Sequence, residues 1–308
     1  MKSTRTGAQT GLAPRAAKER GYFLRQKITP WLILLLPVAF TLWLKYIPIL
    51  RAVYISFFNY DPIRQPGEFV GLGNYRTMFA TRYYWEAWGN TFVFLALQIG
   101  MTFFIPIIQA LFLNEIRRCK SAFSTMYLLP TLIPTTINVI IWRWVWHPDY
   151  GVANALVKLF GAQPQTWLSD PSLVKFCIVF PGVIGGGIAV LLYLSAIQGI
   201  SPDMMESAAI DGCTGWKRIF YITLPNIRFI IFIQLIMAVS SAMQMLDAPY
   251  MFAAGGPSGA STTQGIYIYN AFNRDYNYGR GSAASVVLLL VVMAITLLQM
   301  RFENAERE

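Results

Sequence analysis

Six long apolar stretches alternate with short polar connectors along this chain of 308 residues. Each stretch is long enough for a helix to cross about 30 Å of hydrocarbon. A segment in lipid must satisfy its own backbone hydrogen bonds, and the short alternating strands of a barrel are absent from the sequence. The pattern therefore predicts an all-α integral membrane protein whose spans cover residues 31–58, 89–113, 123–146, 173–197, 224–248 and 283–300.

The spans form one predicted domain, residues 29–302, between a basic tail at 1–28 and a short tail at 303–308. A basic start followed by an apolar run is also the pattern of a cleaved signal peptide. The run is too long for one, and no small-residue cleavage site follows it. We therefore expect it to be retained as the first span.

Composition and charge agree with a membrane location. Hydrophobic residues make up 55% and charged residues only 13%, where a soluble chain carries about 25%; the mean hydropathy is +0.45. Basic residues gather in the N-terminal tail and in the second and third connectors on the same side. The positive-inside rule then predicts cytoplasmic termini in a bacterial cell membrane. The net charge of +10 is expected to face anionic lipid, and not nucleic acid.

Residues that carry enzyme chemistry are scarce. The chain has no phosphate-binding Gly-x-x-x-x-Gly-Lys-Ser/Thr loop, and the glycine-rich run at 182–187 lies inside a span. Cys119, Cys177 and Cys213 share no metal-type spacing, and His147 stands among tryptophans at a predicted outer interface. No catalytic or metal-binding residue is predicted.

The connectors on the opposite side are more than linkers. The stretch 69–88 predicts an interfacial helix and 152–160 a short helix, and a loop rich in Gly, Ser and Thr runs into residues 266–272.

The polar connector at 201–225 is the most informative segment. Ser201-Pro202 favours a helix start, and Gly212 can turn the chain sharply through a positive φ. Residues 214–221 predict a second short helix, with Asp211 either capping it or pairing with a partner's base. The whole predicts a compact elbow that another protein could grip, although an ordinary interfacial helix would have a similar pattern.

Polar side chains inside the spans are costly unless they bind something or bridge helices. Gln234, Ser241, Gln244 and Asp247 recur at helical spacing, and Tyr250 extends that face outward. Amides and aromatic rings suit sugar hydroxyls and ring carbons, so this face is a candidate substrate path. Hydrogen bonding between helices is the alternative for each residue. The full set of candidates is Gln98, Asn138, Tyr193, Gln234, Ser240, Ser241, Gln244, Asp247 and Tyr250.

The order of several short motifs resembles the maltose-type, sugar-transporting branch of ABC importer permeases. These motifs are Phe69-Val70-Gly71-Leu72, Leu129-Pro130, Ile141-Trp142-Arg143-Trp144, Asp149-Tyr150-Gly151, Trp167-Leu168, Glu206 to Pro225 and Gly255-Gly256-Pro257. The resemblance implies the six-helix fold of type I importers and a multi-subunit complex. Its expected partners are a homologous second permease subunit, two cytoplasmic ATPases that bind ATP and Mg, an extracytoplasmic solute-binding protein and a sugar.

The resemblance also implies roles for residues. An ATPase-coupling role falls on Glu206, Ser207, Ala208, Asp211, Gly212, Trp216, Phe220, Leu224 and Pro225. Docking of the binding protein falls on Gly255, Gly256 and Pro257. The chain departs from the family at Ser207 and Cys213, where Ala is usual, and its fourth span lacks the common Trp-x-Gly.

Three other classes compete with this interpretation. An ion-coupled secondary transporter would need repeats or intramembrane ionisable groups. The sequence shows no such repeat, and its spans contain few acidic residues. A membrane-embedded enzyme would need an acid/base or metal constellation. A structural scaffold would leave the elbow and the polar face unexplained.

Overall fold

The computed structural model describes residues 29–31, 33–62, 67–116 and 118–305. The predicted tail at 1–28 and the last three residues, 306–308, lie outside the described part. The chain divides into two compact units, residues 1–54 and 55–308, and each is described by itself.

The first unit contributes one helix, which continues to Ile55 and covers Thr29–Ile55. Within it lie a π-helical turn, η1 (Leu42–Tyr46), and α2 (Ile47–Ile55). The described side chains of residues 29–50 are all exposed, and most are apolar. This matches the predicted first span, whose apolar surface requires lipid or another protein around it.

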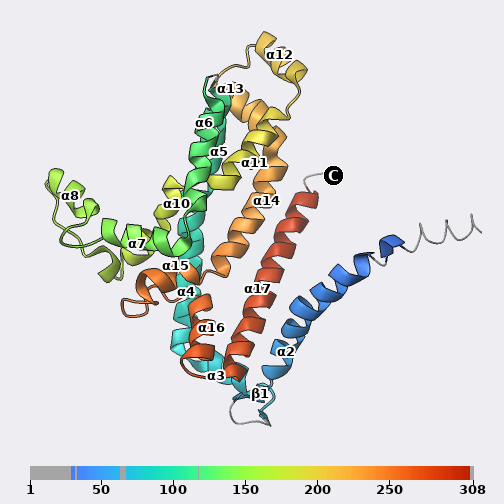
Figure 1. Ribbon diagram of the computed structural model, residues 1–308, viewed down its shortest axis with the longest axis vertical. Coiled ribbons are helices and arrows are strands. Elements are labelled where there is room, and N and C mark those ends of the chain that lie inside the picture. Colours follow the sequence, from blue (N-terminus) through green and yellow to red (C-terminus); the bar gives the residue numbers. More distant parts are fainter. Residues whose placement is uncertain (1–28, 32, 63–66, 117, 306–308) are drawn as a thin grey trace, which may run out of the picture. The chain divides into compact units, whose positions relative to one another are not determined.

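The second unit is a helical bundle with one two-stranded hairpin (Figure 1). The hairpin pairs β1 (Phe58–Asn59) with β2 (Glu68–Phe69). The helices before the polar connector at 201–225 are α3 (Gly73–Ala80), α4 (Arg82–Gln98), η2 (Ile99–Phe103), α5 (Ile105–Glu115), α6 (Lys120–Leu128), η3 (Leu129–Leu132), α7 (Thr135–Val145), α8 (Val152–Leu159), η4 (Trp167–Ser169), α9 (Val174–Val179), α10 (Pro181–Ile184) and α11 (Gly187–Gln198). After it come α12 (Pro202–Ile210), α13 (Trp216–Arg218), η5 (Ile219–Thr223), α14 (Leu224–Met243), α15 (Asp247–Ala253), α16 (Gln264–Asn273) and α17 (Tyr278–Ala305).

Within the described residues, four helices are long and apolar enough to cross a membrane alone: Thr29–Ile55, Arg82–Glu115, Trp216–Met243 and Tyr278–Phe302. Two bent pairs raise the number to six if each counts as one span. Lys120–Leu132 and Thr135–Val145 meet at 92°, and Val174–Ile184 and Gly187–Gln198 at 47°. The six predicted spans are thus consistent with the structure, but the third and fourth are not straight helices.

Proline explains the three π-helical turns. Pro48, Pro106 and Pro225 each lack an amide donor, and each ring crowds the carbonyl four residues earlier. Those earlier residues, Leu44, Thr102 and Tyr221, lie inside η1, η2 and η5 respectively. Widening into a π turn relieves the crowding without ending the helix. The long helices therefore continue through their prolines.

The break in the fourth span is built from glycine. Gly186 and Gly187 have positive φ values of 147° and 44°. A Cβ on Gly186 would lie 2.1 Å from Oε1 of Gln109, and one on Gly187 would lie 2.1 Å from Cγ2 of Thr131. The break frees the carbonyl of Gly185, which accepts a hydrogen bond of 3.1 Å from Nε2 of Gln109 on α5. A side chain of the second span thus replaces a bond that the broken helix lost.

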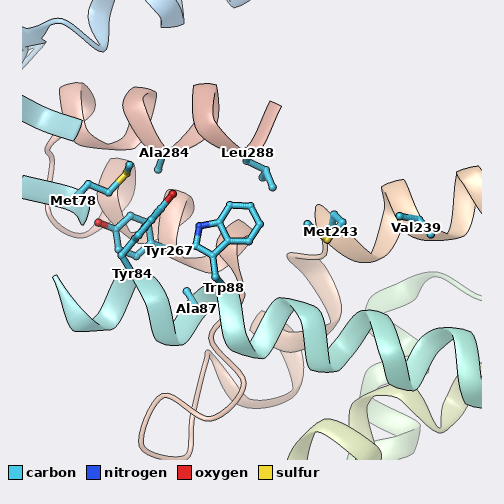
Figure 2. Packing of buried hydrophobic residues seen from close by; sticks show 9 residues of the cluster. All are labelled: Met78, Tyr84, Ala87, Trp88, Val239, Met243, Tyr267, Ala284 and Leu288. Atoms are coloured by element: carbon cyan, nitrogen blue, oxygen red, sulfur yellow. The ribbon is translucent and has the colours of Figure 1, made fainter. Parts of the chain in front are cut away.

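Three apolar clusters hold the second unit together. One joins α3, α4, α14, α16 and α17; Figure 2 shows Tyr84, Trp88 and Tyr267 gathered beside Ala284 and Leu288 of α17. The next, around Phe94, Trp146 and Phe252, holds α7, α8, α9 and α15 to α4. The third joins α5, α11 and α14.

Substitution of Gly186 by Ala should destabilise the protein. The positive φ strains any residue that has a Cβ, and the new methyl group would displace the Gln109 amide that bonds Gly185 and press on Val190 at 2.8 Å, at a cost of about 2–4 kcal/mol. Thermal unfolding in detergent measures this as a lower Tm. Gly89→Ala is the matched control, because nothing lies within 4 Å of its added Cβ. Equal Tm values for the two variants would contradict the account of the break.

Candidate functional site

The polar connector begins with α12, which Ser201 precedes and Pro202 opens, as predicted. The helix ends in a Schellman motif around Gly212, whose φ is 72°. The amide of Cys213 donates to the carbonyl of Ala208 at 2.8 Å, and the amide of Gly212 donates to that of Ala209 at 3.1 Å. The predicted turn at Gly212 is confirmed, and Asp211 sits at the C-terminal cap of α12.

The expectation of a separate second helix at 214–221 is wrong. Gly215 turns the chain again with φ 55°, and from Trp216 the helix runs without interruption to Met243. The π turn η5 lets it pass Leu224-Pro225, which lies between the predicted second helix and the rest of the predicted fifth span. Asp211 therefore caps no second helix, since Gly215 occupies that cap position.

The connector presents apolar side chains to its surroundings. Ile210 is 86% exposed and Trp216 is 73% exposed, and Glu206, Ser207 and Phe220 are exposed as well. Ala208 is buried at the Schellman turn. Figure 1 shows α12 at the end of this unit that is remote from α3 and α16. An exposed helix with a rigid turn and an apolar end is suited to insertion into a cleft of a partner protein.

An ion pair ties the connector to the second span. Arg218 of α13 donates from Nη2 to Oε1 of Glu115 at the end of α5. Beside the pair lies a largely apolar groove of about 750 Å³, lined by α5, by Met205 of α12 and by the start of the fifth span. Glu115 was absent from the sequence-based candidates, because no spacing rule connects residues 103 positions apart.

The predicted polar face is exposed at the other end of the fifth span. Ser241, Gln244, Asp247 and Tyr250 are all exposed in the single chain. The expectation that they share one helix is wrong, because α14 ends at Met243 and Asp247 opens α15. The carbonyl of Met245 accepts a hydrogen bond of 2.6 Å from the hydroxyl of Thr263, which occupies a backbone acceptor at the junction of α14 and α15. Ser241 and Gln244 therefore lie at the end of α14, whereas Asp247 and Tyr250 lie on α15 after the turn of the chain.

The other polar candidates lie in different places. Tyr193 is buried in the cluster of α5, α11 and α14, and its hydroxyl has no hydrogen-bond partner among the described residues. Asn138 lies half-buried on α7, and Gln234 half-buried on α14. Their roles stay predictions.

Tyr269 is a member of the polar face that the sequence did not single out. Its ring centroid lies 4.7 Å from that of Tyr250, at an interplanar angle of 57°. Its hydroxyl is hydrogen-bonded to Tyr250, which raises the pKa of Tyr269. The pair gives the α15 end of the face two adjacent aromatic rings.

The Gly255-Gly256-Pro257 loop is a folded structure, with Gly255 at φ 87°. Thr262 donates to the carbonyl of Gly255, and Ser261 to that of Gly256. Asn90 of α4 donates to the carbonyls of Gly259 and Thr262, both at 2.9 Å. The loop is therefore fixed to the second span, which suits a rigid contact surface.

Among the described residues, no three His, Cys, Asp or Glu side chains are grouped so that they could hold a metal ion.

Residues 102–307 match the family model described as binding-protein-dependent transport system inner membrane component. Among curated relatives, the probable ABC transporter permease protein YurN of Bacillus subtilis is 29% identical over 92% of this chain and 99% of its own length. The sulfoquinovosyl glycerol transport system permease protein SmoG of Agrobacterium fabrum is 30% identical over 87% of this chain and 88% of its own. The trehalose/maltose transport system permease protein MalF of Thermococcus litoralis is 28% identical over 85% of this chain and 89% of its own length.

Solved structures show the same fold. A bacterial ABC transporter that imports the acidic polysaccharide alginate contains a chain with a TM-score of 0.80 and 24% identity, which covers 93% of this chain and 99% of that one. A chain of the bacterial alginate transporter in complex with an alginate pentasaccharide-bound periplasmic protein has a TM-score of 0.79 and 25% identity, and the match covers 90% of this chain and 95% of that one. With its long apolar helices and a family match across two thirds of its length, the chain belongs to the inner membrane components of binding-protein-dependent transport systems.

Proposed function

We propose that this chain is a permease subunit of an ATP-driven importer, and that it forms part of the path for a carbohydrate delivered by an extracytoplasmic binding protein. The observation that carries the proposal is the connector between the fourth and fifth spans. Its rigid turn, exposed apolar end and continuity with the fifth span suit a transmission element between a cytoplasmic ATPase and the membrane.

The proposed complex contains a homologous second permease subunit, two cytoplasmic ATPases that bind ATP and Mg, and the binding protein. Both termini and α12 are cytoplasmic in this arrangement, as the basic connectors favour. The Gly255-Gly256-Pro257 loop then lies on the opposite side, where the binding protein docks. Its anchoring to Asn90 supports this role, because docking to a fixed loop costs little ordering entropy.

A carbohydrate substrate is supported by two independent lines. Two relatives are named for trehalose and maltose and for sulfoquinovosyl glycerol, and the solved neighbours are named for alginate. The exposed face of this chain carries an amide, a carboxylate and the Tyr250–Tyr269 pair, which match hydroxyl pairs and the apolar faces of sugar rings. An ion-coupled secondary transporter, the alternative class, is not favoured by the family.

In this proposal, movement of α12 is passed to the membrane helices through the continuous chain. A displacement of α12 reaches α14 through Gly215 and α13, and reaches α5 through the Glu115–Arg218 pair. Because α5 packs along α11 and α11 contacts α14, movement at the connector shifts three spans together. The path residues at the far end of α14 are thereby linked to events at the ATPase.

The chain alone should not hydrolyse ATP. Its sequence lacks a phosphate-binding loop, so we expect no phosphate release above background from the purified chain. Sustained turnover by a preparation free of other proteins would contradict the proposed division of labour.

Gly212→Val should uncouple the transporter. A β-branched residue at φ 72° strains the Schellman turn by about 1–2 kcal/mol, although its Cβ meets nothing within 4 Å. We expect intact membrane insertion, weaker pull-down of the ATPases and lower uptake. Gly212→Asn is the control, because Asn tolerates this conformation. Normal pull-down and uptake in the Val variant would rule out this turn as the transmission element.

Gln244→Ala tests the path. If Gln244 binds the sugar, loss of up to two hydrogen bonds should weaken uptake affinity about threefold to a hundredfold while the complex keeps its Tm. Gln163→Ala, an exposed amide on a loop, is the matched control. A lower Tm with an unchanged concentration dependence of uptake would assign Gln244 to helix bridging.

A further inference from the structure

The short helix α8 lies between the third and fourth spans and is firmly fixed along one side. Asn154, only 1% exposed, uses its whole amide group: Nδ2 donates to the carbonyls of Pro148 and Gln165, at 2.7 and 2.9 Å. Its Oδ1 accepts from the amide of Gln165 and from Nε1 of Trp167, both at 2.9 Å. Ala153 joins the apolar cluster of α7 and α9.

The start of α8 is equally constrained. A Cβ on Gly151 would lie 2.3 Å from the carbonyl oxygen of His147, so the chain folds back tightly after α7. The rings of His147 and Tyr150 are stacked directly before this turn. The helix is therefore presented in one orientation by both flanking segments.

The outward side of α8 is apolar and exposed. Val152 and Leu156 are exposed on successive turns, and Leu159 and Phe160 are 81% and 88% exposed at the C-terminal end. Lys158 is the single charged residue of α8 and is exposed beside them. Large side chains in this arrangement are expensive in water, so something covers them.

The position of α8 in the chain and the small size of its apolar side indicate what covers that side. If each bent pair counts as one span, α8 lies between the third and fourth spans and α12 between the fourth and fifth, so α8 and α12 lie on opposite sides of the membrane. Tryptophans crowd this level: Trp146 and Trp167 contact at 5.0 Å, and Trp144 is exposed. Aromatic side chains gather where the bilayer meets water. Figure 1 shows α7 and α8 reaching sideways, away from α17.

We infer that α8 is an interfacial helix whose outward side, Val152, Leu156, Leu159 and Phe160, is buried in the lipid leaflet on the extracytoplasmic side. A stable protein–protein interface needs roughly 1,000 Å² or more, which four side chains of one short helix do not supply. A docking protein that leaves after each delivery would also expose the face to water in every cycle. Lipid covers it permanently, and Lys158 extends its ammonium to the headgroups.

The helix then has a mechanical consequence. It fixes the connection between the two bent spans at the level of the headgroups, so that α7 and α9 are held at a constant depth while other helices move.

Site-directed spin labelling in nanodiscs of phosphatidylethanolamine and phosphatidylglycerol tests the inference. Exposed Cys119 and half-buried Cys213 are replaced by Ser, and buried Cys177 is kept. Single labels are placed at Leu159→Cys and Phe160→Cys, with Gln163→Cys as the control on the neighbouring exposed loop. The measurement is the collision rate with oxygen, which enriches in lipid, and with a water-soluble nickel chelate.

Labels at 159 and 160 should collide often with oxygen and rarely with nickel, whereas the label at 163 should show the reverse. Frequent nickel collisions at all three positions would place α8 in water and overturn the inference. Immobilised labels at 159 and 160 that are shielded from both agents would also overturn it, because a protein would then cover the face. Two labelled positions guard against a local artefact at one of them.

Discussion

The backbone of a membrane helix must satisfy its own hydrogen bonds, because hydrocarbon offers no partner for a free amide or carbonyl. This constraint explains most irregularities of the structure. At Pro48, Pro106 and Pro225 the helix widens into a π turn and continues. At Gly185 the helix does break, and Gln109 of a neighbouring span supplies the missing donor. At Met245 the hydroxyl of Thr263 does the same for a carbonyl at the junction of α14 and α15.

The two ways of satisfying the backbone, a π turn and a hydrogen bond from another helix, connect the spans differently. A π turn keeps one helix continuous, so Trp216–Met243 is a single helix that passes through Leu224-Pro225. A repair by a side chain from another helix joins two spans, as Gln109 joins the second span to the fourth. The polar connector uses the first device and adds a lateral link of another kind, the Glu115–Arg218 ion pair to the second span. The second unit thus has a continuous fifth span and an ion pair that joins the start of this span to α5.

Sequence patterns predicted the features that depend on local chemistry. The apolar stretches located the four long helices and the two bent pairs, Ser201-Pro202 located the start of α12, and Gly212 located its turn. What could not be predicted depends on contacts between distant residues. The sequence does not show that Leu224-Pro225 lies within a helix, because propensity favours a stop at proline. Nor does it show that Thr263 meets Met245, or that Tyr269 stands beside Tyr250. The same limit hid Glu115 from the candidate site.

The exposed polar face of the single chain has a consequence for biogenesis. A newly inserted copy that has no partner presents Ser241, Gln244 and the carboxylate of Asp247 on its membrane-embedded surface. An uncompensated carboxylate there is costly, and assembly or hydration within a complex removes the cost. The polar side chains of this face, which we propose line the sugar path, thus also distinguish an unassembled chain from an assembled one.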